Sequence, residues 1–328
     1  MLYRYLGKSG LQVSLLSFGS WVTFANQVDE NKAAELMSFA YDHGVNFFDN
    51  AEIYANGLSE KIMGNVLSKT NWDRSSYLVS SKTFFGRGDK RPNMTGLNRK
   101  HIFESCNEAL RRLQVEYLDL FFAHRPDKKT PIEETVWAMH QLILQGKIFY
   151  WGTSEWSAQE IMEAHMIARQ NHLIGPVMEQ PQYNMLTRNK VEVEFSQIYK
   201  TVGLGTTIWS PLAAGILTSK YLDNEIPKNS RFALQEYHWL KEKNLIPENL
   251  KIAKQLHELS QSLGTSLAKL AIAWCAQNPN VSTVILGATS LEQLKETICS
   301  LDILPLFTEE INTKIELILN NKPIHPPY

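Results

Sequence analysis

The sequence predicts an α/β protein, a (β/α)8 TIM barrel, and three observations favour this class. Eight short runs of apolar, β-branched or aromatic residues alternate with longer amphipathic stretches. The starts of the first seven runs lie roughly 28–41 residues apart, the size of one strand-loop-helix-loop unit. Several runs end in polar residues, and a parallel barrel gathers such strand ends on one face. Because no linker divides the chain, one domain is expected over residues 1–328.

The chain is predicted to open with a short hairpin and then to supply the barrel strands. Residues 2–6 and 11–17 flank the turn signal Lys8-Ser9-Gly10. Strands are expected near residues 15–21, 45–49, 77–81, 118–123, 148–153, 176–180, 204–209 and 283–287. Eight strands are what a closed barrel needs.

Helical patterns with apolar residues three and four positions apart lie between these runs. They cover residues 31–44, 99–113, 131–146, 157–170, 251–263 and 266–277. Pro131 suits a first turn, Gly44 and Gly146 suit C-terminal caps, and Ser157 suits an N-cap. The last two patterns lie in the long connection before the eighth strand, so extra helices are expected in the C-terminal part. A connection of that length is usually functional.

Composition limits the classes of partner. Lys and Arg total 33 against 34 Asp and Glu, with a net charge of −1, so nucleic acid is not an expected partner. Cys106, Cys275 and Cys299 are odd in number and widely spaced, which suggests neither disulfides nor a metal site. The longest apolar segment, residues 267–276, is too short to span a bilayer. We expect a cytoplasmic protein without membrane insertion.

Four polar residues fall at or just beyond the ends of predicted strands: Asp49, Tyr54, Lys82 and His124. A barrel would bring them together as one active site. A lysine ammonium close to a tyrosine stabilises the phenolate and brings its pKa down toward the working range, which suits proton delivery. Two alternatives stay open: Asp49 and Lys82 form an interior ion pair beside a rim tyrosine, and His124 is structural.

Familiar nucleotide-binding fingerprints are absent. Gly86-Arg87-Gly88 and Gly203-Leu204-Gly205 lack a third glycine and do not join a strand to a helix, and Gly7-Lys8-Ser9 lacks the upstream glycine of a phosphate loop. If the protein binds a nucleotide, the expected place is the loops after strands seven and eight, where a helix N-terminus favours phosphate. The candidate segments are residues 210–215, with Lys220 and Arg231, and residues 287–290.

Several motifs agree with one family. In chain order they are LGKSGLQVSLLSFGSWVTF, NFFDNAEIYANG, the Lys82 strand end, HRPD, YWGTSEWS, WSPLAAGILTSKY, SRFAL and VILGATSLEQLKE. Together they resemble the aldo-keto reductases, and most of all the branch with voltage-gated potassium channel β-subunits and their plant and bacterial relatives. The resemblance covers about residues 3–323.

The resemblance implies a catalytic tetrad of Asp49, Tyr54, Lys82 and His124. NADPH would transfer hydride to a carbonyl carbon while Tyr54 protonates the oxygen. The implied cofactor contacts are Ser20, Trp21, Gln27, Asp49, Ser154, Gln180, Trp209, Ser210, Pro211, Leu212, Ala213, Gly215, Lys220, Arg231, Gly287, Thr289, Gln293 and Glu296.

Particular roles follow from the same resemblance. Trp209 would stack on the nicotinamide, and Lys220 would meet the pyrophosphate. Arg231 with Thr289 would hold the ribose 2′-phosphate. The alternatives are core packing for Trp209 and solvated loop charges for the two cations. Glu155 stands where channel β-subunits carry arginine, and His124 where they commonly have asparagine.

Aromatic residues in the loops after strands one and three bear on the class of substrate. Trp21, Phe24, Phe84 and Phe85 predict an aromatic pocket mouth that admits aldehydes or aromatic and dicarbonyl compounds, or else loop packing. The main hypothesis is an NADP(H)-dependent reductase of a small carbonyl substrate. The competing hypotheses are a regulatory NADPH-binding subunit of a potassium channel and a Schiff-base aldolase that uses Lys82. The resemblance also implies a homo-oligomer, with a tetramer as the expected state.

Overall fold

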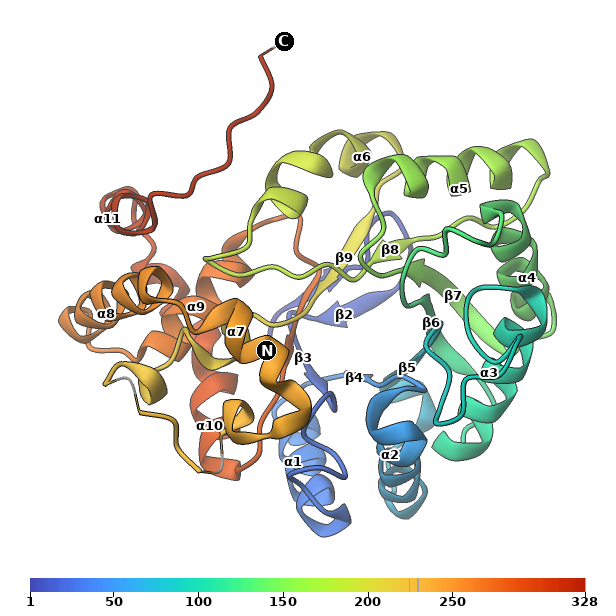
Figure 1. Cartoon of the computed structure of the whole chain (residues 1–328), viewed down its shortest axis with the longest axis horizontal. Helices are drawn as coiled ribbons and strands as arrows, with labels where there is room; N and C mark the ends of the chain where they lie inside the picture. Colours follow the sequence, from blue (N-terminus) through green and yellow to red (C-terminus); the bar gives the residue numbers. More distant parts are fainter. Residues whose placement is uncertain (224, 229, 328) are drawn as a thin grey trace.

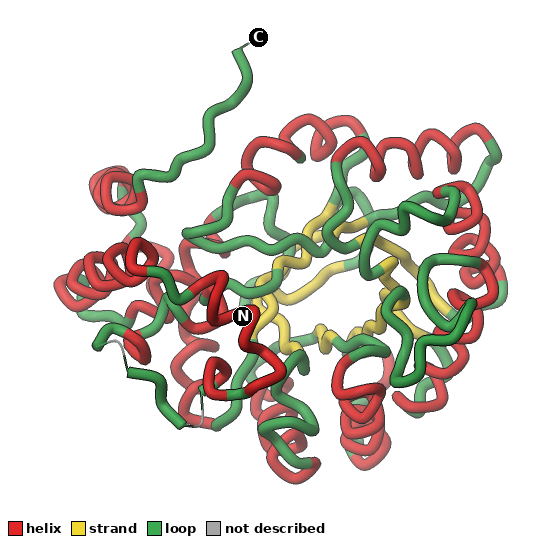
Figure 2. Tube along the Cα trace, in the orientation of Figure 1, coloured by secondary structure: helices red, strands yellow, loops and turns green. Residues whose placement is uncertain are grey.

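Eight parallel strands close into a barrel ringed by helices in the computed structural model, which describes residues 1–223, 225–228 and 230–327 (Figures 1 and 2). The order around the barrel is β10-β3-β4-β5-β6-β7-β8-β9. The strands are β3 (Leu16–Gly19), β4 (Phe47–Asp49), β5 (Leu78–Thr83), β6 (Leu118–Ala123), β7 (Ile148–Thr153), β8 (Met178–Glu179), β9 (Gly205–Ile208) and β10 (Thr283–Leu286). The predicted fold class is confirmed. All eight strands lie within or overlap the predicted ranges, although β8 has only two residues.

The helices cover the outside of the barrel (Figure 1). They are α1 (Glu30–Asp42), α2 (Leu58–Lys69), α3 (Arg99–Leu113), α4 (Ile132–Leu144), α5 (Ala158–Gln170), α6 (Ser196–Thr201), α7 (His238–Asn244), α8 (Pro247–Ser262), α9 (Leu267–Gln277), α10 (Leu291–Ile298) and α11 (Glu309–Leu319). Ser157 forms a capping box with Glu160 at the start of α5, as a serine before a helix favours. Strands β5 and β6 are buried at every position because the barrel interior and the helix layer cover both faces.

The predicted N-terminal hairpin is present and packs on the barrel. Strands β1 (Tyr3–Tyr5) and β2 (Gln12–Ser14) pair antiparallel. Its apolar side chains Leu6 and Val13 are buried in one cluster with barrel residues such as Phe47 and Phe122. Residues 11–17 are thus divided, since only Gln12–Ser14 belongs to the hairpin and Leu16 begins the first barrel strand.

Helix α2 was not among the helical patterns named from the sequence. Its interior contains Gly64, which weakens a helical signal. The structure supplies the reason for this glycine. A Cβ at position 64 would lie 2.2 Å from the backbone oxygen of Arg112, so α2 and α3 approach backbone to backbone there.

No helix in the described part of the chain is long and apolar enough to cross a membrane. The C-terminal segment after α11 leaves the barrel as an extended chain (Figure 1).

A buried carboxyl on β8 sets an expected pH dependence of stability. Glu179 is fully buried, accepts a hydrogen bond from the Thr153 hydroxyl, and its Oε1 has no partner among the described residues. Burial raises the pKa of Glu179 to about 8. The folded protein therefore keeps the proton that the unfolded chain releases near its ordinary pKa of 4.5. Stability should fall as the pH rises from the unfolded pKa to the folded one, by up to about 1.4 kcal/mol per pH unit.

Replacing Glu179 with glutamine should flatten that part of the stability curve. We expect E179Q to gain free energy of unfolding relative to wild type between about pH 5 and pH 8, because glutamine has no proton to lose. Urea unfolding at each pH measures this gain. The matched control is E258Q, which changes an exposed carboxyl on α8. If the free energy of unfolding had the same pH dependence in E179Q and in wild type, the prediction would be contradicted.

Candidate active site

Asp49, Tyr54 and Lys82 meet around one ammonium group. Asp49 ends β4, Lys82 lies near the end of β5, and Tyr54 follows β4 in a short helical turn. Lys82 Nζ lies 2.6 Å from Asp49 Oδ2 and 3.2 Å from Tyr54 Oη, and also donates to the Asn50 carbonyl at 2.7 Å. The lysine is fully buried, so its charge depends on this carboxylate.

His124 completes the group as the residue directly after β6. Its ring lies edge-on to the rings of Tyr54 and Phe85, with centroids 5.9 and 5.1 Å away. The backbone N–H of His124 donates to the Thr83 carbonyl at 3.0 Å, which fixes the residue beside β5. Its Nδ1 is buried without a partner among the described residues. The four residues predicted at strand ends are therefore brought together.

The electrostatics of Tyr54 differ from the expectation. Burial raises the pKa of its phenol well above 10, with a further contribution from the charge of Asp49, while Arg125 opposes the shift. The predicted lowering by Lys82 is wrong for this structure. Burial of the phenol is the largest cause of the raised pKa, and the Asp49 carboxylate, which lies 2.6 Å from Lys82, adds to the upward shift. Tyr54 is held protonated, which suits a proton donor.

His124 is held neutral. Burial lowers its pKa well below 6.5, and the positive charges of Lys82 and Arg125 lower it further. Near neutral pH the site therefore presents a phenol O–H and an uncharged imidazole to the same space. These are two groups able to hydrogen-bond a polarised carbonyl oxygen.

Asp49 is fixed by hydrogen bonds on both carboxylate oxygens. Its Oδ1 accepts from the Ser80 hydroxyl at 2.8 Å and from Gln180 Nε2 at 3.1 Å, while Oδ2 faces Lys82. Ser20 supports the same residue, since its hydroxyl donates to the Asp49 carbonyl at 3.0 Å. The carboxylate therefore has little freedom to turn away from the lysine.

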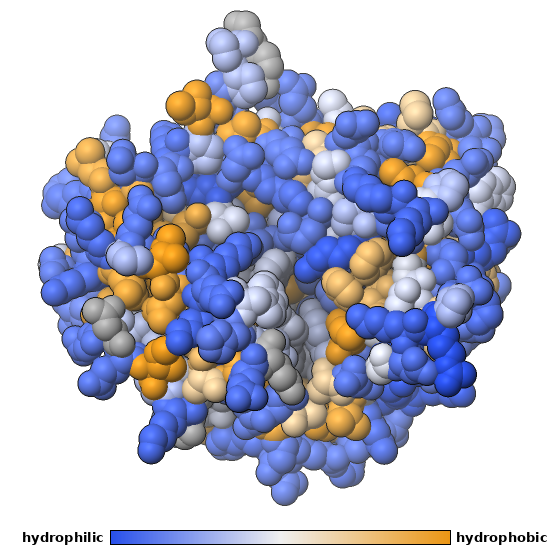
Figure 3. Space-filling model, in the orientation of Figure 1, coloured by the Kyte–Doolittle hydropathy of each residue, from blue (hydrophilic) through white to orange (hydrophobic). Residues whose placement is uncertain are grey.

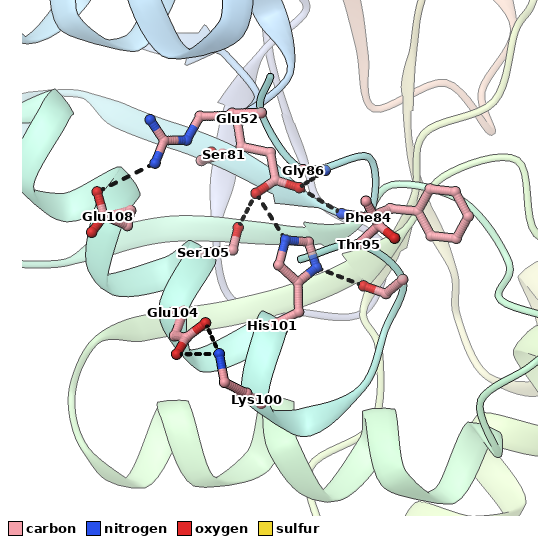
Figure 4. A network of polar contacts seen from close by, with 12 residues as sticks. Glu52, Ser81, Phe84, Gly86, Thr95, Lys100, His101, Glu104, Ser105 and Glu108 are labelled. Carbon is pink, nitrogen blue, oxygen red and sulfur yellow. Dashed lines mark hydrogen bonds and ion pairs between the residues drawn. The ribbon is translucent and has the colours of Figure 1, made fainter. Parts of the chain in front are cut away.

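Glu52, a buried carboxylate two residues before Tyr54, connects the surrounding loops (Figure 4). Glu52 Oε1 accepts from the backbone N–H groups of Phe84 and Gly86, both at 2.9 Å, and Oε2 accepts from Ser105 at 2.7 Å and lies 3.4 Å from His101 Nε2. The loop after β4 is thereby fastened to the loop after β5 and to α3. Phe85, between the two bonded amides, is held against His124.

A cavity of about 550 Å³ opens beside the tetrad, and most residues predicted from the resemblance line it. The face of the molecule seen in Figure 3 is hollowed near its middle, over the barrel. The predicted residues on its wall are Trp21, Gln27, Asp49, Tyr54, His124, Ser154, Gln180, Trp209, Ser210, Pro211, Leu212, Gly215, Lys220, Arg231, Gly287, Thr289, Gln293 and Glu296.

Three predicted site residues are not on the wall of this cavity. Lys82 lies behind Tyr54, Ser20 is buried on the Asp49 carbonyl, and Ala213 is buried in the hydrophobic core. The predicted aromatic mouth is also corrected in part. Phe24 packs in the core and Phe84 packs on the edge of Phe85 away from the wall.

A family model described as the Aldo/keto reductase family matches residues 15–318. The chain belongs to the aldo/keto reductase family. Members are oxidoreductases that generally use NAD(P)H. A "Probable voltage-gated potassium channel subunit beta" of Oryza sativa subsp. japonica is 52% identical over 323 residues, covering 98% of each chain. The protein of the same name from Arabidopsis thaliana is 51% identical over 326 residues, covering 99% of each. The resemblance drawn from the sequence motifs is confirmed.

The donor set in this aldo/keto reductase fits a dinucleotide. Lys220 and Arg231 line the cavity, and neither forms an ion pair with an acidic residue among those described. Gly287 also lines it, and a Cβ there would meet no atom within 4 Å, so it would project into open space. Two cations beside a side-chain-free stretch of wall suit phosphate groups.

Arg231 and Thr289, which were predicted to act together, have different neighbours. The Arg231 guanidinium lies over the Trp21 ring at 5.3 Å, whereas the Thr289 hydroxyl donates to Gln293 Oε1 at 3.1 Å. A hydrogen bond of 3.2 Å from Asn26 to the Tyr237 hydroxyl joins the loop after β3 to the segment that carries Arg231. Both residues still line the same cavity.

Glu155, which departs from the channel β-subunit pattern, positions Trp209. Its Oε1 accepts from the Trp209 indole N–H at 2.9 Å and from the Gln182 backbone N–H at 2.6 Å, and Oε2 pairs with Lys190 at 3.1 Å. The backbone of Glu155 has φ of 61°, a conformation that favours glycine, so local structure holds it there. The indole expected to face the nicotinamide is thereby oriented from behind.

Several cavity residues were not found from the sequence. Arg125, Ile53, Trp239, His257 and Gln261 line the wall. The motif HRPD did contain a signal for Arg125, because it follows His124 at a strand end. The α8 residues His257 and Gln261 had none, since only the folding of the long connection back onto the barrel brings them to the wall.

Proposed function

We propose that this aldo/keto reductase reduces aldehydes and ketones with NADPH, with Tyr54 as the proton donor. The observation that carries the proposal is a tyrosine hydroxyl 3.2 Å from a buried lysine nitrogen, on the wall of a cavity that His124 and Trp209 also line. A buried Asp49–Lys82 pair of purely structural use would not need a tyrosine hydroxyl in contact with it.

The residues divide the reaction between them. The cofactor, when bound, supplies a hydride to the carbonyl carbon. Tyr54 gives its proton to the carbonyl oxygen, and Lys82 stabilises the resulting phenolate from 3.2 Å. Neutral His124 hydrogen-bonds the same oxygen and helps to orient it. Trp209, held by Glu155, presents a flat apolar face to the nicotinamide side of the cavity.

Steady-state turnover tests the proposal. Purified protein with NADPH and either 4-nitrobenzaldehyde or methylglyoxal should consume NADPH over many turnovers, followed by its absorbance. Product analysis should find the corresponding alcohol in equal amount. A single turnover or none with both compounds, from folded protein that binds NADPH, would count against a carbonyl reductase.

Cofactor preference gives a second test. Replacing Arg231 with alanine should weaken NADPH binding more than NADH binding, by about 1–3 kcal/mol, because a charge-assisted contact to the 2′-phosphate is lost. Fluorescence titration with each cofactor measures the two dissociation constants. The matched control is R91A, since Arg91 is exposed and ion-paired with Asp89. Equal weakening of both cofactors by R231A would place Arg231 away from the 2′-phosphate.

The relatives' names favour a second candidate, a regulatory NADPH-binding subunit of a potassium channel with vestigial chemistry. Slow or absent turnover together with tight NADPH binding would favour it.

A Schiff-base aldolase is the weaker third candidate, because Lys82 is buried and paired with Asp49. Borohydride trapping with an aldehyde should give no adduct on Lys82.

We also propose a cytoplasmic location and a homotetramer. Light scattering would test the tetramer.

A further inference from the structure

Arg125 lies beside the tetrad on the cavity wall but is not one of its four residues. It follows His124 directly and lines the cavity wall. Its Nη1 donates to the His124 carbonyl at 2.5 Å and to the Ser154 hydroxyl at 3.3 Å. The guanidinium carbon lies 5.5 Å from the centre of the Phe85 ring. These contacts fix the plane of the guanidinium beside His124.

The other edge of the guanidinium is free. Nε and Nη2 of Arg125 make no hydrogen bond with any residue the structure describes, and neither atom is among the buried atoms without a partner. They therefore remain accessible to solvent, on a side chain that lines the cavity. Nε–H and Nη2–H form the planar fork that binds a carboxylate through two parallel hydrogen bonds.

The charge of Arg125 is also not compensated nearby. Among the described residues, no carboxylate oxygen lies within 4.0 Å of its guanidinium. The acidic groups around it already have partners: Asp49 faces Lys82, and Glu155 faces Lys190. Asp127 accepts from the backbone N–H groups of Leu97 and Lys129. Arg125 therefore has no carboxylate of the described residues as an ion-pair partner.

We propose that Arg125 selects carbonyl substrates that carry a carboxylate, which binds the free edge of the guanidinium while the carbonyl oxygen lies at Tyr54 and His124. This inference rests on the proposed carbonyl reductase and names its substrate class. The single positive charge of the Arg125 guanidinium matches the single negative charge of one substrate carboxylate. The aromatic walls formed by Trp21 and Phe85 suit an aromatic or apolar spacer between the carbonyl and the carboxylate.

A matched substrate pair tests the inference. 4-Carboxybenzaldehyde and its methyl ester are similar in size but differ in charge, and their difference in carbonyl reactivity is the same for every variant, so it cancels when variants are compared. The readout is the ratio of kcat/KM for the acid to kcat/KM for the ester, with NADPH saturating. R125M should lower this ratio by about tenfold to a hundredfold, as expected for the loss of a bidentate charge-assisted contact. R125K, which keeps the charge without the fork, should fall between wild type and R125M.

Control variants and measurements distinguish carboxylate binding by Arg125 from a role in cofactor binding or in folding. R91M removes a positive charge from an exposed arginine that does not line the cavity, and should leave the ratio unchanged. NADPH dissociation constants and thermal unfolding are measured for each variant. Equal loss on both substrates in R125M, or a weaker NADPH affinity that accounts for the loss, would overturn the inference and assign Arg125 to the cofactor or to folding.

The outcome also distinguishes this inference from the proposed function. A wild-type protein that reduces the ester but shows the same ratio as R125M keeps the reductase and overturns the role of Arg125. A wild-type protein that reduces neither compound overturns the role of Arg125, and it overturns the reductase as well if 4-nitrobenzaldehyde and methylglyoxal are also not reduced. Glyceraldehyde 3-phosphate serves as a further arm, and an Arg125-dependent preference for it over 4-carboxybenzaldehyde would overturn the carboxylate assignment.

Discussion

Replacing Tyr54 with phenylalanine is expected to lower kcat/KM for carbonyl reduction by about 10²–10⁴-fold, the usual contribution of a general acid. The change removes only the hydroxyl that lies 3.2 Å from Lys82 Nζ. The ring keeps its packing against Trp21 and His124, at centroid distances of 6.5 and 5.9 Å. The remaining site would have no group of suitable acidity at the carbonyl oxygen, because burial keeps His124 uncharged.

Initial rates of NADPH consumption with 4-nitrobenzaldehyde measure the effect. NADPH binding by fluorescence and the thermal unfolding of Y54F should stay close to wild type, so that lost activity is not lost folding. The matched control is Y41F, which removes a hydroxyl that is hydrogen-bonded to Ser76 on the outside of α1. Wild-type turnover in Y54F would end the assignment of Tyr54 as the proton donor.

The positions of the tetrad could be predicted because they depend on topology alone. In a parallel barrel every strand end opens on one face, so the apolar runs before Asp49, Lys82 and His124 were sufficient to bring those residues together. The strand ranges were read from the same runs. The short β8 was overestimated because Val177 and Gln180 flank the pairing without belonging to the strand.

The acidity of Tyr54 could not be predicted from the same pattern. A lysine beside a tyrosine lowers its pKa only if the lysine's charge is not cancelled, and burial of both groups acts in the opposite sense. Burial of the phenol is the largest cause of its raised pKa and the nearby Asp49 charge adds to it, and both are features of the folded structure. Phe24 shows the same limit, since an aromatic residue in a loop motif can turn into the core as readily as toward a pocket.

The Asp49–Lys82 pair should therefore have separable roles in stability and in chemistry. Lys82→Met would leave the Asp49 carboxylate buried without its counter-charge. We expect the free energy of unfolding to fall by about 3–5 kcal/mol, as for other buried pairs that lose one partner. Carbonyl reduction should also be lost, because nothing would stabilise the Tyr54 phenolate. Urea unfolding and NADPH-dependent turnover measure the two effects.

The double variant Asp49→Asn with Lys82→Met distinguishes the roles. Removing both charges leaves no buried ion, so the double variant should recover much of the stability that K82M loses, while the amide oxygen of the introduced asparagine can still accept hydrogen bonds from Ser80 and Gln180. Its activity should stay as low as that of K82M, since the ammonium is still missing.

The control is K100M, which breaks the exposed pair between Lys100 and Glu104 and should change the free energy of unfolding and the turnover little. If K82M were as stable as wild type, the carboxylate would not depend on the lysine. If the double variant regained turnover, the ammonium would not be what stabilises the phenolate, and the proton-transfer step would need another group.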